Sequence, residues 1–261
     1  MPSTMAAPSV FFAMPSASLF KFPPDRAPQP LAPPPSGSSS SAPPFTIPAW
    51  LFNAALNVYV PILIASLYAL SANFLNAYNK STGNKPWQIS KTRAFFWFVV
   101  AHNVFLAVYS GWTFVGMLNA LRRTVQNPAG PFGLVGTADS MCKLHGAAGI
   151  GNAIVYSPNV SQWVSESPGK DLLIDMGSPS STEMGRLWNE GLAFYGWFFY
   201  LSKFYEVLDT VIILAKGKKS STLQTYHHAG AMMCMWAGIR FMSPPIYTFV
   251  LLNSAIHALM V

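Results

Sequence analysis

Three polar clusters near the end of the given sequence hold residue types suited to proton transfer and nucleophilic attack. Histidine has an unperturbed pKa of about 6.5, so an imidazole can serve as a general base or a nucleophile near neutral pH. Amide and carboxylate neighbours can orient such rings. The clusters comprise Lys203, Glu206, Asp209 and Thr210, then Gln224, His227 and His228, and finally Asn253 and His257.

The first cluster interrupts an otherwise apolar run. At about 100° per residue, Lys203, Glu206 and Asp209 lie within one sector of a helix, so all three can face a protein interior, with Thr210 on the adjoining edge. Lys203 and Glu206 are close enough to pair, either as part of a site or as a structural ion pair between helices. Asp209 has no cationic partner of its own in the sequence.

The other two clusters place imidazoles beside amides. Gln224 can reach His227 at i+3 or His228 at i+4, and adjacent imidazoles suit proton transfer or metal ligation. Asn253 can orient His257 at i+4. Each histidine could instead be a buried interface residue bonded to the backbone.

The remaining histidines lack comparable neighbours. We expect structural roles for His102, which is followed by Asn103, and for His145.

The elements that must position these residues are membrane helices. The chain is 51% hydrophobic and 10% charged, whereas soluble domains carry roughly 25% charged residues. No Asp, Glu, Lys or Arg occurs in residues 27–79, 94–121 or 241–261. A spanning helix needs only about 20 predominantly apolar residues. We therefore predict an all-α, polytopic bundle that lies in lipid.

Five spans are expected in residues 47–261. Pro61 should be tolerated or kink the first span. Residues 1–46 are rich in Pro and Ser and are predicted to be disordered, with a signal peptide as the alternative. The polar segment 122–187 is predicted to be a loop outside the membrane. The spans are expected within 49–78, at about 94–120, 188–215 and 223–241, and from about 246 onward.

Charge sets the expected orientation. The net charge of +7 comes largely from basic residues in two short loops, near Lys85 and Lys218, which the positive-inside rule places in the cytosol. Nucleic-acid binding is therefore not expected. The N-terminus and segment 122–187 would lie in the lumen, where the sequon at Asn159 could be glycosylated and the one at Asn79 could not.

Cysteine offers one further alternative. Cys234 lies two turns after His227 on nearly the same helical face, so a thiol nucleophile is conceivable, although free cysteine more often simply packs. Cys142 lies in the polar segment and is expected at another level of the bilayer, so no disulfide framework is predicted.

The three clusters resemble the sequence boxes of the very-long-chain fatty acid elongases. The first looks like the K-x-x-E-x-x-D-T box, the second is similar to the Q-x-x-H-H variant of the H-x-x-H-H box, and the third resembles N-x-x-x-H-x-x-M, ending at Met260. Their order and distances match the family. The likeness is strongest over residues 188–261 and extends back to about residue 48, including Lys85-Pro86 and the His102-Asn103 pair.

The resemblance implies seven spans around a narrow acyl tunnel, with the N-terminus in the lumen of the endoplasmic reticulum and the site near the cytosol. The implied reaction condenses acyl-CoA with malonyl-CoA to 3-oxoacyl-CoA, carbon dioxide and CoA, with no metal or redox cofactor. Reductase and dehydratase enzymes of the elongation cycle would be partners. The resemblance leaves open whether the protein forms a homodimer.

The resemblance also implies residue roles. His227 would accept the acyl chain or activate malonyl-CoA, with His257 and Asn253 assisting. His228 and Gln224 would orient rings and bond the thioester oxygen. Lys203 would contact anionic substrate groups or hold helices together through Glu206, beside Asp209 and Thr210.

Two features depart from the commoner family pattern. Gln224 stands where the first histidine of the box is usual, a variant associated with polyunsaturated substrates. The sequence stops at Val261, before the last two helices, so we expect a fragment with an open tunnel and little activity.

Two other functions compete with elongation. A membrane di-iron desaturase or hydroxylase also uses clustered histidines, but five histidines in total are few for two irons. A transporter could use Lys203, Glu206 and Asp209 as an ion pathway, although the two halves show no inverted repeat.

Overall fold

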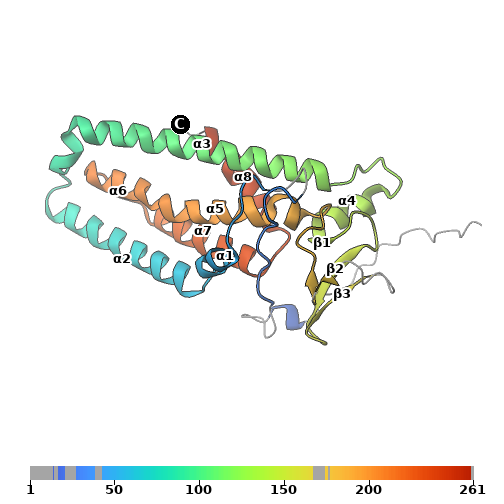
Figure 1. The fold of residues 1–261 in the computed structure, drawn as a ribbon. Helices are drawn as coiled ribbons and strands as arrows, with labels where there is room; N and C mark the ends of the chain where they lie inside the picture. Colours follow the sequence, from blue (N-terminus) through green and yellow to red (C-terminus); the bar gives the residue numbers. More distant parts are fainter. Residues whose placement is uncertain are drawn as a thin grey trace, which may run out of the picture.

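A computed structural model describes residues 14, 17–20, 28–38, 43–166, 174–175 and 177–259. Its largest part is an elongated bundle of helices (Figure 1), which confirms the predicted all-α membrane bundle. Two of the helices, α2 and α3, are long and apolar enough to cross a membrane, and α8 is a shorter apolar helix. The bundle comprises α1 (Ala49–Ala55), α2 (Tyr59–Ser81), α3 (Arg93–Thr124), α5 (Ala193–Tyr205), α6 (Val207–Ala215), α7 (Thr222–Arg240) and α8 (Ile246–Leu259).

The first predicted span is two helices rather than one. The break between α1 and α2 precedes Pro61, which lies in the first turn of α2, where its missing N–H costs no helical hydrogen bond. A break inside lipid leaves carbonyl groups that need donors. Aromatic side chains supply them: Trp197 Nε1 donates to Phe52 O at 3.3 Å, Tyr200 Oη to Ala55 O at 2.9 Å and Trp236 Nε1 to Leu56 O at 2.8 Å.

The predicted span 188–215 is also interrupted. It consists of a π-helical turn at Trp188–Leu192 followed by α5 and α6, which meet at Glu206. There the Asp209 N–H donates to the Glu206 carbonyl at 3.1 Å, a tight i+3 bond that separates the two helices. The interruption falls inside the first polar cluster.

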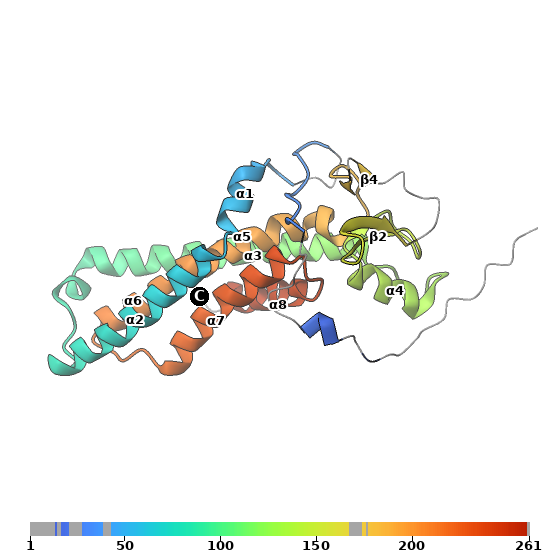
Figure 2. The same ribbon diagram turned by 90° about the horizontal axis from the view of Figure 1, so that it is seen from below.

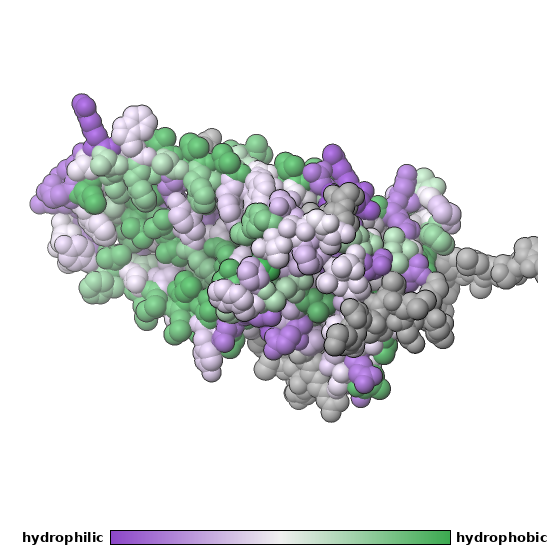
Figure 3. Space-filling model, viewed as in Figure 1, coloured by the Kyte–Doolittle hydropathy of each residue, from purple (hydrophilic) through white to green (hydrophobic). Residues whose placement is uncertain are grey.

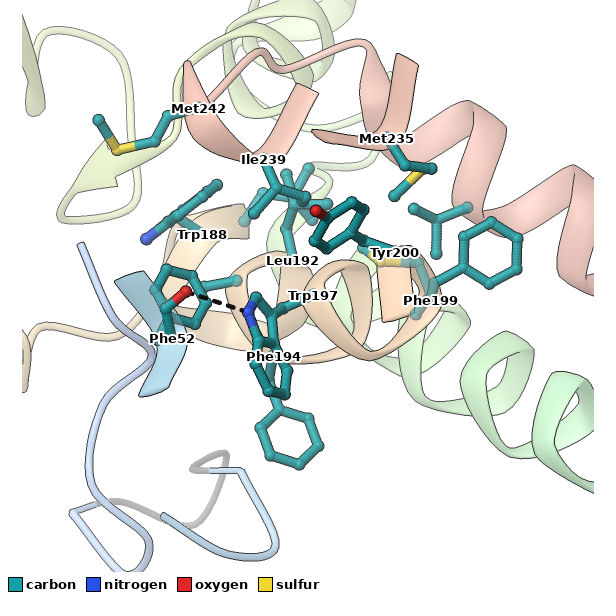
Figure 4. Close-up of a cluster of buried hydrophobic side chains, with 14 of the residues drawn as sticks. Phe52, Trp188, Leu192, Phe194, Trp197, Phe199, Tyr200, Met235, Ile239 and Met242 are labelled. Carbon is teal, nitrogen blue, oxygen red and sulfur yellow. Dashed lines mark hydrogen bonds between the residues drawn. The ribbon is translucent and has the colours of Figure 1, made fainter. Parts of the chain in front are cut away.

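Aromatic side chains fill the centre of the bundle. Trp188, Phe194, Phe199 and Tyr200 are fully buried between α1, α5 and α7 (Figure 4). Outside, hydrophobic side chains cover much of the helical region, and hydrophilic ones are more frequent toward the two ends (Figure 3). The exterior is therefore suited to lipid and the interior to close packing.

Segment 122–187 holds more regular structure than the predicted loop. It contains α4 (Gly133–Cys142) and three antiparallel strands in the order β1-β2-β3, with a second pair, β4 and β5. Buried Arg186 joins its parts, donating to Asp139 Oδ2 and to Gly149 O, each at 2.8 Å. The strands are β1 (His145–Gly146), β2 (Ala153–Ser157), β3 (Gln162–Ser165), β4 (Ile174–Asp175) and β5 (Ser178–Pro179).

Part of the segment expected to be disordered is packed. Within 28–38, Leu31 O accepts from Trp188 Nε1 and Pro28 O accepts from Arg240 Nη1, each at 2.8 Å. The structure differs here from the predicted tail because the aromatic and guanidinium donors at this end bind the Pro-rich backbone. Residues 1–13, 15–16, 21–27 and 39–42 of the predicted tail lie outside the described residues.

The two basic loops lie at the same end of the bundle, opposite α4 and the strands (Figures 1 and 2). Buried Asn79 ties them together: its Nδ2 donates to Leu214 O and its Oδ1 accepts from Trp87 Nε1, each at 2.8 Å. The Trp87 N–H also donates to Ala215 O at 2.9 Å. This grouping agrees with a common side of the membrane for both loops.

His145 is a buried imidazole in the strand region. It is 4% exposed and contacts the rings of Trp163 and Trp188, with centroids 5.0 and 5.9 Å away. Burial lowers its pKa to about 3 because the charged form loses its hydration. The ring is therefore neutral in the folded protein at neutral pH.

We expect this burial to make stability depend on pH. The unfolded chain binds the proton below about pH 6.5 and the folded chain only near pH 3. The unfolding free energy therefore falls by about 1.4 kcal/mol for each unit by which the pH drops across that window. His145→Gln should remove this slope. Detergent-solubilised protein followed by intrinsic fluorescence measures it, and equal pH slopes for both proteins would contradict the prediction.

Candidate active site

A cavity of about 630 Å³ opens between α3, α6, α7 and α8, at the end of the bundle that carries the basic loops. It brings together residues from all three sequence clusters. Lys203, Glu206 and Thr210 lie behind its wall rather than on it. Its polar lining consists of Asn103, Asp209, Lys216, Gln224, His227, His228, Asn253 and His257.

The predicted Lys203–Glu206 pair forms and is almost fully buried. Lys203 Nζ donates to Glu206 Oε1 at 2.5 Å, and the two side chains are 1% and 2% exposed. Lys203 Nζ also donates to Asn253 Oδ1 at 2.8 Å and lies 3.9 Å from the centre of the Phe199 ring. The pair therefore ties the junction of α5 and α6 to α8.

The second oxygen of Glu206 faces two imidazoles. His228 Nδ1 from α7 and His257 Nε2 from α8 each lie 3.9 Å from Glu206 Oε2. This distance is too long for a hydrogen bond but close enough for charge on either ring to be stabilised. Glu206 thus stands at the centre of the site, between helices that are distant in sequence.

His227 is the most accessible of the three clustered imidazoles. It is exposed, lines the cavity and lies with its ring centre 5.7 Å from that of His228. An imidazole that lines a cavity in this way is accessible to a bound molecule and can act on it as a nucleophile or a base.

The two amides bind different groups from those expected. Gln224 Nε2 donates to Thr210 Oγ1 at 3.2 Å, and Asn253 accepts from Lys203. The hydrogen bonds that the sequence allowed, from Gln224 to His227 or His228 and from Asn253 to His257, do not form among the described residues. Bonds to neighbouring helices replace them, since the interrupted α5–α6 segment places its polar groups within reach.

Asp209 has a partner that the sequence did not reveal. Its Oδ1 lies 2.7 Å from Nε2 of His102 on α3, so Asp209 has a hydrogen-bond partner on a helix that is distant in sequence. The imidazole has no exposed side-chain surface, whereas the Asp209 side chain is 30% exposed and lines the cavity. The polar His102-Asn103 pair within an uncharged stretch was the available signal.

Tyr68 was also missed. Its hydroxyl lies 2.9 Å from Thr210 Oγ1, and its ring meets that of His228 edge-on with centres 6.1 Å apart. One tyrosine among the three of an apolar helix carries no sequence signal of such a role. In contrast, Cys234 is exposed and does not line the cavity, which removes the support for a thiol nucleophile.

Comparison with known families leads to the same family as the three sequence boxes. The family model described as "ELO: GNS1/SUR4 family" matches residues 53–261. The chain belongs to this family. The resemblance inferred from the motifs is therefore confirmed, and the match covers the cavity and every helix that lines it.

Curated relatives of this ELO-family protein match over shorter stretches. "Fatty acid elongase 2" of Trypanosoma brucei brucei is 31% identical over 78 residues, 30% of this chain and 29% of that protein. "Very long chain fatty acid elongase 7" of Rattus norvegicus is 36% identical over 67 residues, 24% of each chain. "Very long chain fatty acid elongase 1" of Homo sapiens is 29% identical over 111 residues, 41% of this chain and 37% of that protein.

These matches cover well under half the length of each relative. No solved structure matches the chain.

The buried ion pair of this ELO-family protein should be needed for folding. Lys203→Met leaves the Glu206 carboxylate unpaired, so we expect the unfolding free energy to fall by about 3 to 5 kcal/mol. Adding Glu206→Gln should recover much of that loss because the unpaired charge is removed.

Thermal unfolding in detergent micelles measures both effects. The control is Lys219→Met, which removes an exposed cation from a basic loop and should change stability by no more than about 0.5 kcal/mol. Equal unfolding midpoints for Lys203→Met and Lys219→Met would show that the pair is dispensable.

Proposed function

We propose that this protein is a fatty acid elongase that condenses malonyl-CoA with a long-chain acyl-CoA to give 3-oxoacyl-CoA, carbon dioxide and CoA. The observation that carries the proposal is the cavity in which His227, His228 and His257 meet beside two internally paired carboxylates. Its family and the names of its relatives support the same chemistry.

The reaction needs a nucleophile, a carbanion equivalent and a leaving thiolate. Malonyl-CoA loses its carboxylate as carbon dioxide, and the electron pair left on the α-carbon forms the new bond to the acyl carbon. The acyl C–S bond breaks, and the CoA thiolate takes up one proton. Imidazoles can activate the thioester carbonyl and move that proton.

In the proposed mechanism His227 accepts the acyl group, since it is the accessible imidazole: a ring nitrogen bonds the acyl carbon as the C–S bond breaks, and this C–N bond breaks when the malonyl α-carbon attacks. His228 lies behind it, and Glu206 stabilises positive charge on His228 and His257 from 3.9 Å. Gln224 lines the same cavity, and the second N–H of its amide, whose nitrogen also donates to Thr210 Oγ1, can bond the thioester oxygen. Asn253 is anchored by Lys203 and holds α8 in register with the site.

The surroundings of the cavity suit a substrate with a charged head group and an apolar tail, such as an acyl-CoA. Lys216 lines the cavity, and Lys85, Lys218 and Lys219 lie in the neighbouring loops, where phosphate groups of CoA would be attracted. The same cavity also has apolar lining, from Val99, Leu106, Ile212, Ile213 and Ile256. An acyl chain would therefore extend along an apolar wall that excludes water.

The proposal also covers the substrate range, the cofactors and the cellular location of the protein. Gln224 in the second box resembles the variant associated with polyunsaturated substrates, so the proposed substrate range includes polyunsaturated acyl-CoAs. No metal is required, so stoichiometric iron in the purified protein would contradict the proposal. We place the protein in the endoplasmic-reticulum membrane with the reductase and dehydratase of the cycle.

Loss of His227 should abolish condensation. His227→Ala removes the proposed acyl acceptor, and we expect formation of 3-oxoacyl-CoA to fall by a factor of about 10³ or more. The measurement uses a completed, active chain expressed in microsomes, with radiolabelled malonyl-CoA, a panel of acyl-CoAs and protein abundance held equal.

The matched control is Tyr226→Ala, an adjacent residue on α7 that is 77% exposed and does not line the cavity. It should retain activity. If His227→Ala retained as much activity as Tyr226→Ala, the assignment of His227 would be refuted.

A further inference from the structure

Helix α2 is connected to the active site although none of its described residues lines the cavity. It packs against α6 and α7, which carry Thr210 and Gln224 (Figure 1). The Tyr68 hydroxyl on α2 lies 2.9 Å from Thr210 Oγ1, and Gln224 Nε2 donates to the same oxygen at 3.2 Å. A chain of hydrogen bonds therefore runs from α2 through α6 to an amide on the cavity wall.

The first part of this chain is buried. Tyr68 and Thr210 are 5% and 2% exposed, so their hydroxyl groups depend on protein partners. A threonine in a helix divides between two side-chain rotamers because its Oγ1 can turn back to a carbonyl of its own helix. The Tyr68 hydroxyl favours the other rotamer, in which Thr210 Oγ1 meets α2 and α7.

The oxygen end of the same amide faces a second residue that α2 holds. Gln224 Oε1 lies 3.5 Å from Ser220 Oγ. Asn76 on α2 fixes the backbone of Ser220: the Ser220 N–H donates to Asn76 Oδ1 at 3.0 Å, and its carbonyl accepts from Asn76 Nδ2 at 3.1 Å. Both ends of the amide therefore lie next to residues that are bonded to α2.

The orientation of this amide decides which of its groups meets a substrate. The nitrogen carries two N–H donors and the oxygen only accepts. Because Thr210 takes one N–H of Gln224, the second remains for a molecule in the cavity. An amide released from Thr210 can turn over, and its oxygen would then repel the negative charge that develops on a thioester oxygen.

We propose that Tyr68 is a positioning residue that directs the Gln224 amide at the thioester oxygen through the Thr210 hydroxyl. This inference rests on the proposed function, in which Gln224 bonds that oxygen. Tyr68 selects the rotamer of Thr210, Thr210 holds one N–H of Gln224, and the second N–H stabilises the oxygen as the carbonyl carbon is attacked. Tyr68 itself lies outside the cavity lining.

The stretching frequency of a bound carbonyl reports its hydrogen bonds and tests this role. The probe is an acyl-CoA analogue in which CH₂ replaces the thioester sulfur and the carbonyl is isotope-labelled. Infrared difference spectra are recorded with the purified full chain in nanodiscs. The frequency should be lower in the wild-type protein than in Gln224→Leu, which lacks the amide.

Tyr68→Phe removes one hydroxyl and keeps the ring that meets His228 edge-on. We expect it to lose most of the frequency difference between the wild-type protein and Gln224→Leu. The matched control is Tyr59→Phe, because Tyr59 lies on the same helix, is 69% exposed and does not line the cavity. This control should keep the wild-type frequency.

A double variant tests whether Tyr68 acts through the amide. In the Gln224→Leu background, Tyr68→Phe should cause no further shift because no amide is left to orient. An unchanged frequency in Tyr68→Phe, or an equal shift in the Gln224→Leu background, would overturn the inference. Should Tyr68→Phe fail to fold, as judged by thermal unfolding, Thr210→Val and Thr210→Ser decide instead: the first should lose the frequency difference, and the second, which keeps the hydroxyl, should retain it.

Failure of this inference is distinguishable from failure of the proposed function. A protein that elongates acyl-CoA but whose bound carbonyl is insensitive to Tyr68→Phe refutes this inference alone. A protein that shows the Tyr68-dependent shift but forms no 3-oxoacyl-CoA supports the inference and refutes condensation. A wild-type protein that does not bind the analogue, or whose carbonyl frequency equals that of Gln224→Leu, overturns the inference outright.

Discussion

A buried ion pair is the constraint around which the site is arranged. Lys203 and Glu206 lie inside an apolar bundle, where an unpaired charge would be costly, so each needs a partner and further hydrogen bonds. Lys203 finds Asn253 on α8, and Glu206 faces His228 on α7 and His257 on α8. Satisfying one pair of charges thus brings three helices together at the wall of the cavity.

Interruptions of the helices make this convergence possible. The break at Glu206 places polar groups of α5 and α6 within reach of neighbouring helices, and the break before α2 is stabilised by Trp197, Tyr200 and Trp236. In lipid, irregular backbone persists only where protein groups satisfy it. The aromatic core therefore supports the scaffold, and the polar clusters form the site at one end of it.

The sequence predicted those features that depend on composition and on positions within one helix. Long apolar stretches predicted the bundle, and the helical period placed Lys203 and Glu206 together. Contacts between distant segments carried no such signal: His102 and Asp209 are 107 residues apart, and Tyr68 and Thr210 are 142 apart. The strands of segment 122–187 were missed because they are short and lie among turns. Gln224 was expected to bond within its own helix, but its side chain donates to Thr210 on α6.

The central claim is that the imidazoles of α7 and α8 and the carboxylates of α5 and α6 form one reaction chamber. An experimental structure of the protein with a non-hydrolysable acyl-CoA analogue tests it most directly. The account predicts that the thioester-equivalent carbonyl lies in the cavity within about 3.5 Å of His227, with the CoA phosphates near Lys216. An analogue bound elsewhere, with its carbonyl remote from His227, His228 and His257, would contradict it.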